Sequence, residues 1–375
     1  MSKSKVYFTD LRTHGGTTLL QKLEKLVKKA GLMEMDFENR FTAIKIHFGE
    51  SGNVAYLRPN FSRVIVDMVR EAGGKPFLTD CNTLYVGRRK DALEHLDAAY
   101  ENGYNPFATH CQMIIADGLK GTDDVEVPVD GEYVNKAKIG RAIMDADILI
   151  SMTHFKGHEN TGFGGTIKNI GMGSGSRRGK MEMHAAGKPS VLSKRCRDCK
   201  VCGKICAFGA IRYDNGSAAI NHDVCVGCGR CMGVCAFDAI VSPYDESFDI
   251  LNRKMAEYTL AVVKDRPQFH ISFVMDVSPF CDCHAENDLP IIQDVGIFAS
   301  TDPVALDQAC ADACNAAPVI SGSYLDDQLK GHNHGHDATG DRFCATHPDT
   351  DWRVCLSHGE KIGLGSQSYE LITVK

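Results

Sequence analysis

Eight closely spaced cysteines carry the clearest chemistry in this sequence. They are Cys196, Cys199, Cys202 and Cys206 in a first run and Cys225, Cys228, Cys231 and Cys235 in a second. Each run has the spacing C-x2-C-x2-C-x3-C, which in bacterial ferredoxins holds an iron–sulfur cluster through thiolates. The residues after the last cysteine also repeat, as Cys-Ala-Phe-Gly-Ala-Ile at 206–211 and Cys-Ala-Phe-Asp-Ala-Ile at 235–240. The repeat predicts a duplicated cluster-binding unit.

The pairing of cysteines with clusters follows from the two-cluster ferredoxins, in which the fourth cysteine of each run binds the other cluster. We therefore expect two [4Fe-4S] clusters, one on Cys196, Cys199, Cys202 and Cys235 and one on Cys225, Cys228, Cys231 and Cys206. Zinc sites usually pair two C-x2-C knuckles across a longer loop, and disulfides need an oxidising compartment, so both alternatives are disfavoured. Ala207 and Ala236 replace the usual proline, which is not a ligand.

A second group of reactive side chains follows the predicted strands. The candidates are His47, Asp80, His154, Lys156 and His158. Because ligands of parallel α/β sheets bind at the carboxyl ends of strands, we expect these side chains to line one cleft. The histidines would donate protons or bind a ligand, Lys156 would pair with an anion, and Asp80 would orient its neighbours. The alternative is that each residue caps a loop or is a satisfied surface group.

The stretch 154–180 is rich in glycine and basic residues. Gly164 and Gly165 would let a ligand approach the backbone, and Lys168 would pair with its negative charge. This combination predicts a pocket for an anionic substrate or cofactor. The alternatives are a flexible basic lid, or a surface that meets the cysteine runs that follow.

Two further tracts have the composition of metal sites. Cys281, Cys283 and His284 could ligate a third metal together with His154 and His158, although buried thiols are an equally supported interpretation. The histidine-containing loop 331–337 resembles a metal-binding tract, but a polar loop that is solvated or shields the cleft is favoured.

The elements that must position these groups alternate between strand and helix. Before the cysteine runs we expect strands at 5–11, 41–48, 75–80, 112–116 and 147–151, with helices at 17–29, 59–72, 88–103 and 137–144. After them we expect strands at 270–276, 294–299 and 370–374, with helices at 247–263 and 302–316. This order predicts an α/β fold with a mostly parallel sheet flanked by helices.

The cysteine runs interrupt this alternation. We expect residues 1–190 and 241–375 to form one discontinuous α/β domain, with residues 191–240 as an inserted α+β two-cluster ferredoxin domain. The ends of a duplicated ferredoxin lie close together, which favours insertion. Three consecutive domains are the alternative, but the C-terminal part alone has few strands with which to close a core.

Composition narrows the class of protein and its partners. With 43% hydrophobic and 24% charged residues the chain is typical of globular proteins, and its net charge of −6 argues against a nucleic-acid partner. The N-terminus shows no signal sequence, and the most apolar stretch, 143–152, is too short and too acidic for membrane insertion. Sixteen cysteines in such a chain predict a cytoplasmic, reducing environment, and the thiol content suits an anaerobe.

Four strings carry a resemblance to a known family. They are Gly-Gly-Lys-Pro-Phe-Leu-Thr-Asp-Cys-Asn-Thr-Leu-Tyr at 73–85, Ser-Met-Thr-His-Phe-Lys-Gly-His at 151–158, Gly-Phe-Gly-Gly-Thr-Ile-Lys-Asn at 162–169 and Gly-Ile-Phe-Ala-Ser-Thr-Asp-Pro-Val-Ala-Leu-Asp-Gln-Ala at 296–309. The chain resembles iron–sulfur centre proteins classed as domain of unknown function 362 (DUF362), in the form with an inserted ferredoxin. The resemblance implies two [4Fe-4S] clusters, cytoplasmic residence, prokaryotic origin and no established reaction.

Three functions from different classes remain open on the sequence. The leading hypothesis is an iron–sulfur oxidoreductase, in which the clusters relay electrons to a ligand or small-molecule substrate at the cleft. The second is a non-enzymatic ferredoxin-type carrier whose α/β domain docks a redox partner protein. The third is a metallocofactor assembly or delivery protein that uses the Cys and His side chains near the strand ends.

Overall fold

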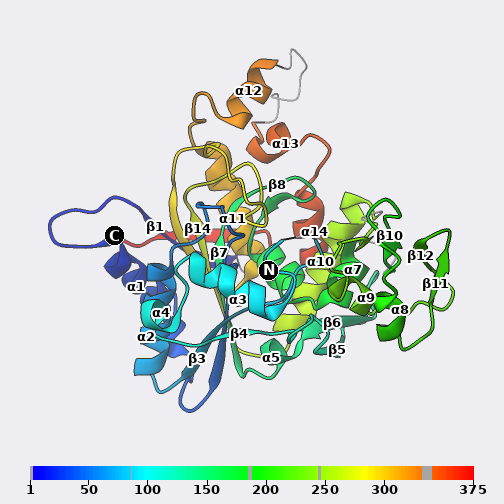
Figure 1. Cartoon of the computed structure of the whole chain (residues 1–375). Helices are drawn as coiled ribbons and strands as arrows, with labels where there is room; N and C mark the ends of the chain where they lie inside the picture. The colour runs from blue at the N-terminus through cyan, green and yellow to red at the C-terminus, as the bar shows by residue number, and fades with distance from the viewer. Residues whose placement is uncertain (1–2, 86, 185–187, 244–245, 332–339) are drawn as a thin grey trace.

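A mostly parallel sheet forms the centre of the α/β body in the computed structural model (Figure 1). The structure describes residues 3–85, 87–184, 188–243, 246–331 and 340–375. Within them, eight strands lie in the order β16 (Tyr369–Thr373), β1 (Ser4–Asp10), β15 (Gly296–Ser300), β14 (Gln268–Val274), β7 (Ile148–His154), β2 (Phe41–Lys45), β3 (Lys75–Asp80) and β4 (Met113–Ile115). β15 is antiparallel to β1 and β14, whereas the other neighbours pair in parallel. The predicted fold class is confirmed.

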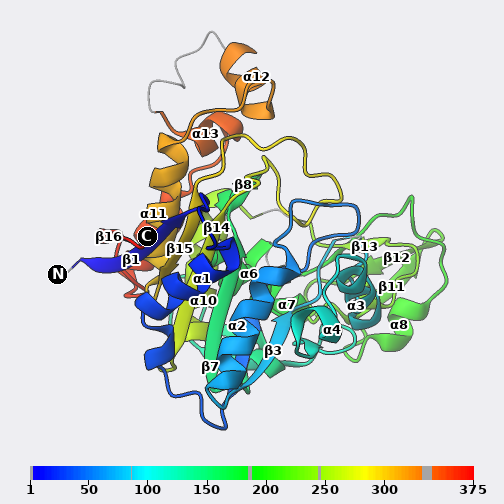
Figure 2. The same cartoon turned by 90° about the vertical axis from the view of Figure 1, so that its left-hand side faces the viewer.

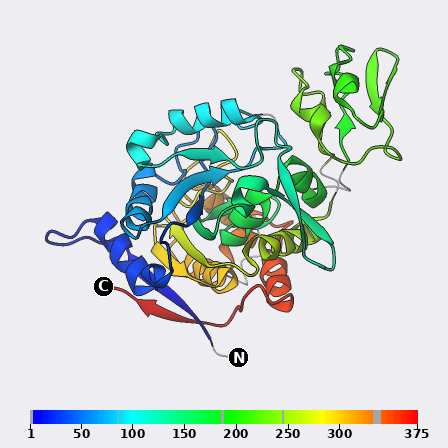
Figure 3. The same ribbon diagram turned by 90° about the horizontal axis from the view of Figure 1, so that it is seen from below.

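Helices cover both faces of this sheet (Figure 2 and Figure 3). One face packs against α1 (Leu19–Lys29), α2 (Pro59–Glu71) and α3 (Ala92–Glu101), and the other against α6 (Thr166–Ser174), α10 (Phe248–Val263), α11 (Pro303–Ala316) and α14 (Arg353–Lys361). Successive residues of a strand point to opposite faces, so in β2 Ala43 joins one core and Ile44 the other. Because both faces are covered, the central strands β7, β14 and β15 are buried along almost their whole length.

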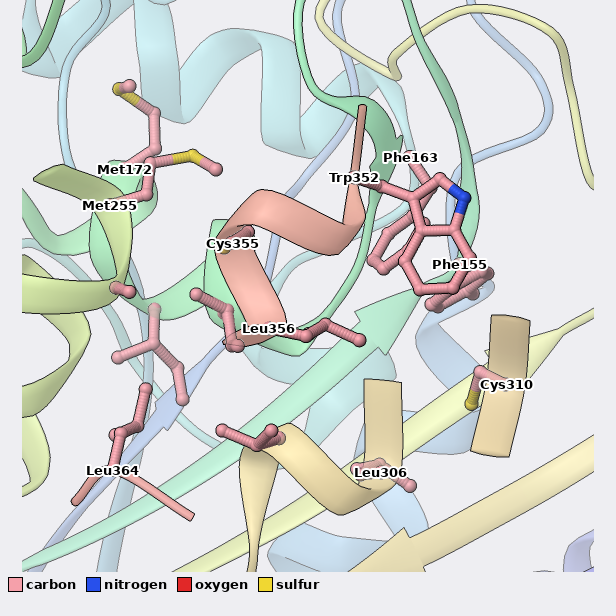
Figure 4. Close-up of a cluster of buried hydrophobic side chains, with 14 of the residues drawn as sticks. Phe155, Phe163, Met172, Met255, Leu306, Cys310, Trp352, Cys355, Leu356 and Leu364 are labelled. Carbon is pink, nitrogen blue, oxygen red and sulfur yellow. The ribbon is translucent and has the colours of Figure 1, made fainter. Parts of the chain in front are cut away.

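In the core between the sheet and helices α6, α10, α11 and α14, an aromatic cluster fixes a short hairpin beside the sheet. Figure 4 shows Phe155, Phe163 and Trp352 packed in this core. The ring centroids of Phe155 and Phe163 are 4.7 Å apart, and those of Phe163 and Trp352 are 5.3 Å apart. Phe155 directly precedes β8 (Lys156–His158), and Phe163 lies within β9 (Gly162–Gly164). The core therefore holds the backbone that carries three of the predicted site residues, Lys156, His158 and Gly164.

Local sequence signals account for several element boundaries. β3 has the bounds expected from the sequence, and Gly73 ends the preceding helix with a positive φ of 80°. The side chain of Asp302 accepts hydrogen bonds from the backbone N–H groups of Val304 and Ala305, and Pro303 occupies the first helical position. α11 therefore begins where the sequence predicts.

The predicted helix at 137–144 is wrong over its first half. Residues Lys136–Gly140 form β6, which pairs with β5 (Asp124–Pro128), and only Arg141–Met144 are helical, as α5. Ala137 and Ile139 are fully buried and Lys138 between them is not, which is the alternation of a strand. Pairing with β5 decides the conformation of this segment.

The cysteine-rich segment forms a small unit that projects from the body (Figure 3). It contains a hairpin of β11 (Ile211–Asp214) and β12 (Ser217–Ile220) and the short helices α8 (Val201–Ile205) and α9 (Arg230–Gly233). β10 (Ser190–Val191) pairs in an antiparallel manner with β13 (Ile240–Val241), so the two ends of the segment lie side by side. The chain therefore leaves and re-enters the α/β body at one place.

In the described part of the chain, no helix combines the length and the apolar character that a membrane crossing requires.

We predict that a buried histidine in β14 makes the stability of the fold depend on pH. Burial lowers the pKa of His270 to about 3, and its ring nitrogens contact Ser151 Oγ and Gln268 Oε1, both at 2.9 Å. The unfolded chain therefore binds a proton below about pH 6.5 that the folded chain does not. The contribution of the buried, neutral His270 to stability is therefore complete above that pH. It decreases by up to about 1.4 kcal/mol for each unit of acidification towards pH 3.

Chemical unfolding between pH 5 and 8 checks this prediction. His270→Gln removes the titrating group, so its free energy of unfolding should decrease less steeply towards pH 5 than that of the wild type. The substitution His14→Gln at an exposed histidine serves as a control and should keep the wild-type slope. Parallel curves for wild type and His270→Gln would contradict the assignment.

Candidate functional site

A cavity of about 780 Å³ opens at the carboxyl ends of β2 and β3. Its titratable lining residues include Lys45, His47, Glu50, Asp80, Arg89, Lys156, His158, Glu159, Lys168, Lys180, His184, Cys283 and His284. The residues predicted from the sequence that line the cavity are His47, Asp80, Lys156, His158, Gly165 and Lys168. His154 and Gly164 are not among the described residues that line it. The sequence thus located the cavity, although not every group that forms it.

Asp80 is the centre of a buried charge network at the floor of the cavity. Its Oδ1 lies 2.9 Å from Lys45 Nζ, and its Oδ2 lies 3.6 Å from Arg89 Nη1. Burial alone would raise the pKa of Asp80, but Lys45, with smaller contributions from His47, His95 and Arg89, lowers it overall. Asp80 is therefore ionised and lies in contact with Lys45 and Arg89; the orienting role expected for it stays a prediction.

Arg89 joins several parts of the cavity wall. Its Nε donates to Glu50 Oε2 at 3.0 Å, its Nη1 lies 2.9 Å from His47 Nε2, and its Nη2 donates to Tyr85 Oη. Burial, and then the charge of Arg89, lower the pKa of His47 well below its usual value. His47 is therefore neutral. Arg89 escaped the sequence analysis because nothing in its local sequence shows that it pairs with a glutamate 39 residues away.

His95 is a further buried group that the sequence analysis missed. It lies in α3 with its Nε2 3.8 Å from Asp80 Oδ2, and neither ring nitrogen has a hydrogen-bond partner among the described residues. Burial lowers its pKa to about 3, so the ring is neutral. A single histidine on the apolar face of a helix carries no sequence signal that separates it from a core residue.

His154 occupies a structural position rather than the cavity wall. Its Nδ1 lies 2.8 Å from Asp282 Oδ1, and its Nε2 lies 3.0 Å from the carbonyl oxygen of Met275. Lys156 also contacts Asp282, at 3.1 Å, and donates to the carbonyl oxygen of His154. His154 therefore holds the loop after β14 in place, whereas Lys156 reaches the cavity.

His158 and two cysteines meet at one side of the cavity. The ligand atoms of His158, Cys281 and Cys283 lie within 4.8 Å of one another, and Lys168 Nζ donates to Cys281 Sγ at 3.1 Å. The hydrogen bond from Cys283, together with the charge of Lys168, lowers the pKa of Cys281 well below its usual value. Cys281 is therefore a thiolate. The structure brings the predicted C-x-C pair to His158 and leaves His154 apart.

Gly165 serves packing rather than ligand binding through the backbone. The N–H groups of Thr166 and Ile167 at the start of α6 donate to the carboxylate of Asp307, at 2.7 and 2.9 Å. A Cβ at Gly165 would lie 2.6 Å from Asp307 Oδ1, so only glycine fits. The amides expected to receive an anion are thus occupied by the chain's own carboxyl group.

The glycine-rich stretch is built into the body and is not a flexible lid. It folds into β8, β9, α6 and α7 (Arg177–His184), and most of its residues are buried. A Cβ at Gly164 would lie 3.1 Å from Lys156 Cε and 3.4 Å from Lys168 Cδ. Gly164 thus borders the stems of both lysines and lets them lie close together.

The eight clustered cysteines surround two small cavities. Cys196, Cys199, Cys202 and Cys235 line one of them, and Cys206, Cys225, Cys228 and Cys231 line the other. Backbone N–H groups donate to several of the sulfurs, including Ala218 to Cys196 and Ala239 to Cys235, both at 3.3 Å. Four thiols around each space, with amides that stabilise negative sulfur, fit the cubane clusters expected from the spacing.

The cysteine-rich unit and the cavity share one wall. Leu84 lines the cavity and also belongs to the hydrophobic cluster that contains Cys202 and Cys231. Lys90 forms an ion pair with Asp238 and donates to the carbonyl oxygen of Cys235 at 3.1 Å. Arg177 of α7 donates to the carbonyl oxygen of Lys90. The glycine-rich stretch therefore meets the cysteine unit. A surface of this kind is one of the alternatives that the sequence left open for residues 154–180.

Arg177 is unusually buried for a guanidinium. Its side chain is only 1% exposed, and its Nε and Nη1 have no hydrogen-bond partner among the described residues. A Cβ at Gly229 would lie 3.0 Å from Arg177 Cγ, so this glycine lets the side chain pass beside the second cysteine run. Arg177 thus places positive charge between the body and the unit.

Comparison with known proteins gives one family match over most of the chain. The family described as "Domain of unknown function (DUF362)" matches residues 42–312. A thylakoid-associated protein of Synechocystis sp. is 27% identical over 119 residues, which are 32% of this chain and 33% of that protein. An uncharacterized ferredoxin of Methanocaldococcus jannaschii is 33% identical over 70 residues, which are 16% of this chain and 42% of that protein. The chain thus spans less than half the length of these two relatives.

The third curated relative and two solved structures complete the comparison. The pyruvate synthase subunit PorD of M. jannaschii is 37% identical over 60 residues, which are 16% of this chain and 70% of that subunit. A crystal structure of a Thermotoga maritima protein has a TM-score of 0.42 at 13% identity, covering 81% of this chain and 60% of that one. The lactate racemase apoprotein from Thermoanaerobacterium thermosaccharolyticum has a TM-score of 0.32 at 11% identity, covering 73% and 51%.

We predict that paired substitutions reveal which cysteines share a cluster. Cys206 and Cys228 line one cavity, whereas Cys199 lines the other. In the variant Cys206→Ala/Cys228→Ala both changes affect one cluster, so about half of the iron should remain. In Cys206→Ala/Cys199→Ala each cluster loses a ligand, and little iron should remain. Iron and sulfide analysis of anaerobically purified protein measures the difference, and the reverse result would show that each run holds its own cluster.

Proposed function

The chain belongs to the DUF362 family and carries a ferredoxin-like iron–sulfur segment, and we propose that this segment delivers electrons to a ligand bound in the cavity of the α/β body. The observation that carries the proposal is the shared wall at Leu84, which lines the cavity and packs among the cluster cysteines. A carrier that only exchanged electrons with other proteins would have no need of a cavity lined by many titratable groups behind its cysteine unit. The inserted unit, residues 191–240, is in this proposal the redox module of the discontinuous α/β domain.

The cysteines would hold two [4Fe-4S] clusters, which when bound supply single electrons. Backbone amides of Ala210, Ala218 and Ala239 donate to cysteine sulfurs, which stabilises negative charge there. Arg177 adds a buried positive charge on the side that faces the body. The ion pair of Lys90 with Asp238 keeps the unit docked on the cavity wall.

The cavity offers both a positive charge for an anionic ligand and a source of protons. Burial would lower the pKa of Lys168, but Cys281 and Cys283 raise it overall, so Lys168 stays protonated. Lys156 lies at the same wall, bound to Asp282. These two lysines would bind a carboxylate or phosphate of the ligand. His158 would exchange protons with the reduced ligand, since reduction of an organic group consumes protons with the electrons.

The network around Asp80 would keep its part of the cavity wall rigid and neutral overall. Asp80 and Glu50 balance Lys45 and Arg89, whose side chains are only 1% exposed, whereas Lys168 is partly exposed and would meet an incoming anion first. His47, held neutral beside Arg89, presents a polar ring without a charge. Ligand charge would therefore be recognised on the Lys156–Lys168 side.

We predict that Lys168→Met impairs oxidation of the reduced protein by its ligand. Clusters reduced anaerobically are mixed with a panel of small carboxylates and phosphate esters that carry a reducible carbonyl or carbon–carbon double bond. Cluster re-oxidation is followed by visible absorbance. Loss of a charged contact should lower kcat/KM for an active compound by about 10- to 100-fold, which corresponds to about 1.5–3 kcal/mol. Lys361→Met, at an exposed ion pair with Glu132, should leave kcat/KM unchanged.

Oxidation by a small viologen dye, which needs no anion site, provides the second control. It should proceed at the wild-type rate in both variants. If no compound oxidises the clusters, or if Lys168→Met and wild type react equally with every one, the non-enzymatic carrier becomes the better hypothesis.

A further inference from the structure

The cavity contains a set of metal-ligating side chains that includes His158, whose proposed exchange of protons applies when no metal ion occupies the set. The ligand atoms of His158, Cys281 and Cys283 lie within 4.8 Å of one another. His158 is 4% and Cys281 1% exposed, so two of the three groups are buried. His158 Nδ1 accepts a hydrogen bond from Asn160 N–H at 3.0 Å, so binding of an ion through Nε2 would shift the ring proton to Nδ1 and replace this hydrogen bond. Three such donors within this distance can surround one ion.

The loop that carries the cysteines is held on several sides. His284 N–H donates to the carbonyl oxygen of Cys281 at 3.0 Å, which closes a tight turn over the two thiols. Glu50 N–H donates to the carbonyl oxygen of Asp282 at 2.9 Å, so the turn is fixed to the segment after β2. A site built on such a pre-formed turn needs little rearrangement to accept a ligand.

Gly157 explains how His158 reaches this turn. Its N–H donates to the carbonyl oxygen of Ser278 at 2.8 Å, and the carbonyl group of Pro279 lies so close that a Cβ would not fit. The glycine thus lets β8 lie directly against the loop after β14. His158, the next residue, is thereby placed opposite the cysteines.

The donor types select the class of metal. Thiolate sulfur and imidazole nitrogen favour zinc and ferrous iron over magnesium or calcium, which prefer oxygen ligands. Lys168 donates to Cys281 Sγ at 3.1 Å, so a cation lies beside one of the two sulfur ligands. The neighbouring set of Glu159, Cys283 and His284 is less suited, because Glu159 and His284 already pair with each other at 3.0 Å and both are partly exposed.

We propose that His158, Cys281 and Cys283 bind one thiophilic divalent metal ion, with its fourth position open to the cavity. Three protein ligands and an open position are the arrangement of catalytic rather than structural zinc sites. His158 and Cys283 line the cavity, so a ligand held by Lys156 and Lys168 would meet the ion there. The site lies wholly in the α/β body and does not depend on electron transfer from the cysteine-rich unit.

Zinc binding to the anaerobically purified, full-length protein tests this proposal. The protein is incubated with zinc sulfate under reducing conditions and desalted, and its zinc and iron are measured together by mass spectrometry. The wild type should retain about one zinc per chain, and the zinc absorption edge should show two sulfur ligands and one nitrogen ligand from the protein. Cys281→Ser and His158→Ala should each weaken binding by more than about 100-fold, beyond the loss expected for residues outside the coordination shell.

The controls separate this site from the clusters. Iron content should be unchanged in both variants, because the cluster cysteines are untouched. Cys344→Ser removes a half-buried thiol in α13 (Arg342–Thr346), outside the cavity, and should retain the zinc. His158 and Cys281 lie on different elements, so a folding defect in one variant leaves the other informative. A wild type that binds no zinc when its thiols are reduced, or zinc retained by both variants, would overturn the proposal.

Discussion

The buried carboxylate of Asp80 is the constraint on which the arrangement of the site depends. It lies at the end of β3, where Lys45 from β2 and Arg89 from the following loop neutralise it. Removing one partner of such a buried pair typically destabilises a protein by about 3–5 kcal/mol, because the other charge is left uncompensated. The pairing therefore fixes the two strand ends and, through Arg89, the segment that bears Glu50. The charges of this network neutralise one another, so the cavity beside them can stay open without leaving an unpaired buried charge.

The same region of the chain connects the cavity with the cysteine-rich unit. A few residues after Asp80, Leu84 enters the hydrophobic cluster of the unit, and Lys90 contacts it through Asp238 and Cys235. α7 supports the contact from the other side with Arg177 and with Met181, which belongs to the same cluster. The strand end that positions the cavity charges thus leads directly into the docking surface. Electron supply and ligand binding would be coupled by this short connection.

Sequence reasoning recovered what local spacing determines and missed what long-range pairing determines. The cysteine spacing was sufficient to group the thiols as the structure groups them, because ligand geometry is encoded within a short run. Strand ends located His47, Asp80 and His158, but the sequence could not show that His154 turns towards Asp282, a residue 128 positions away. The antiparallel direction of β15 likewise depends on distant partners, and so does the pairing of β6 with β5.

The central claim is that the iron–sulfur centres lie against the wall of the cavity. Anomalous diffraction at the iron edge, from crystals of the anaerobically prepared protein, tests it most directly. We predict iron within both four-cysteine cavities, with Leu84 between the unit and the cavity and with the Lys90–Asp238 pair intact. A cysteine-rich unit detached from the body, with Leu84 exposed to solvent, or iron absent from either set of cysteines, would contradict the account.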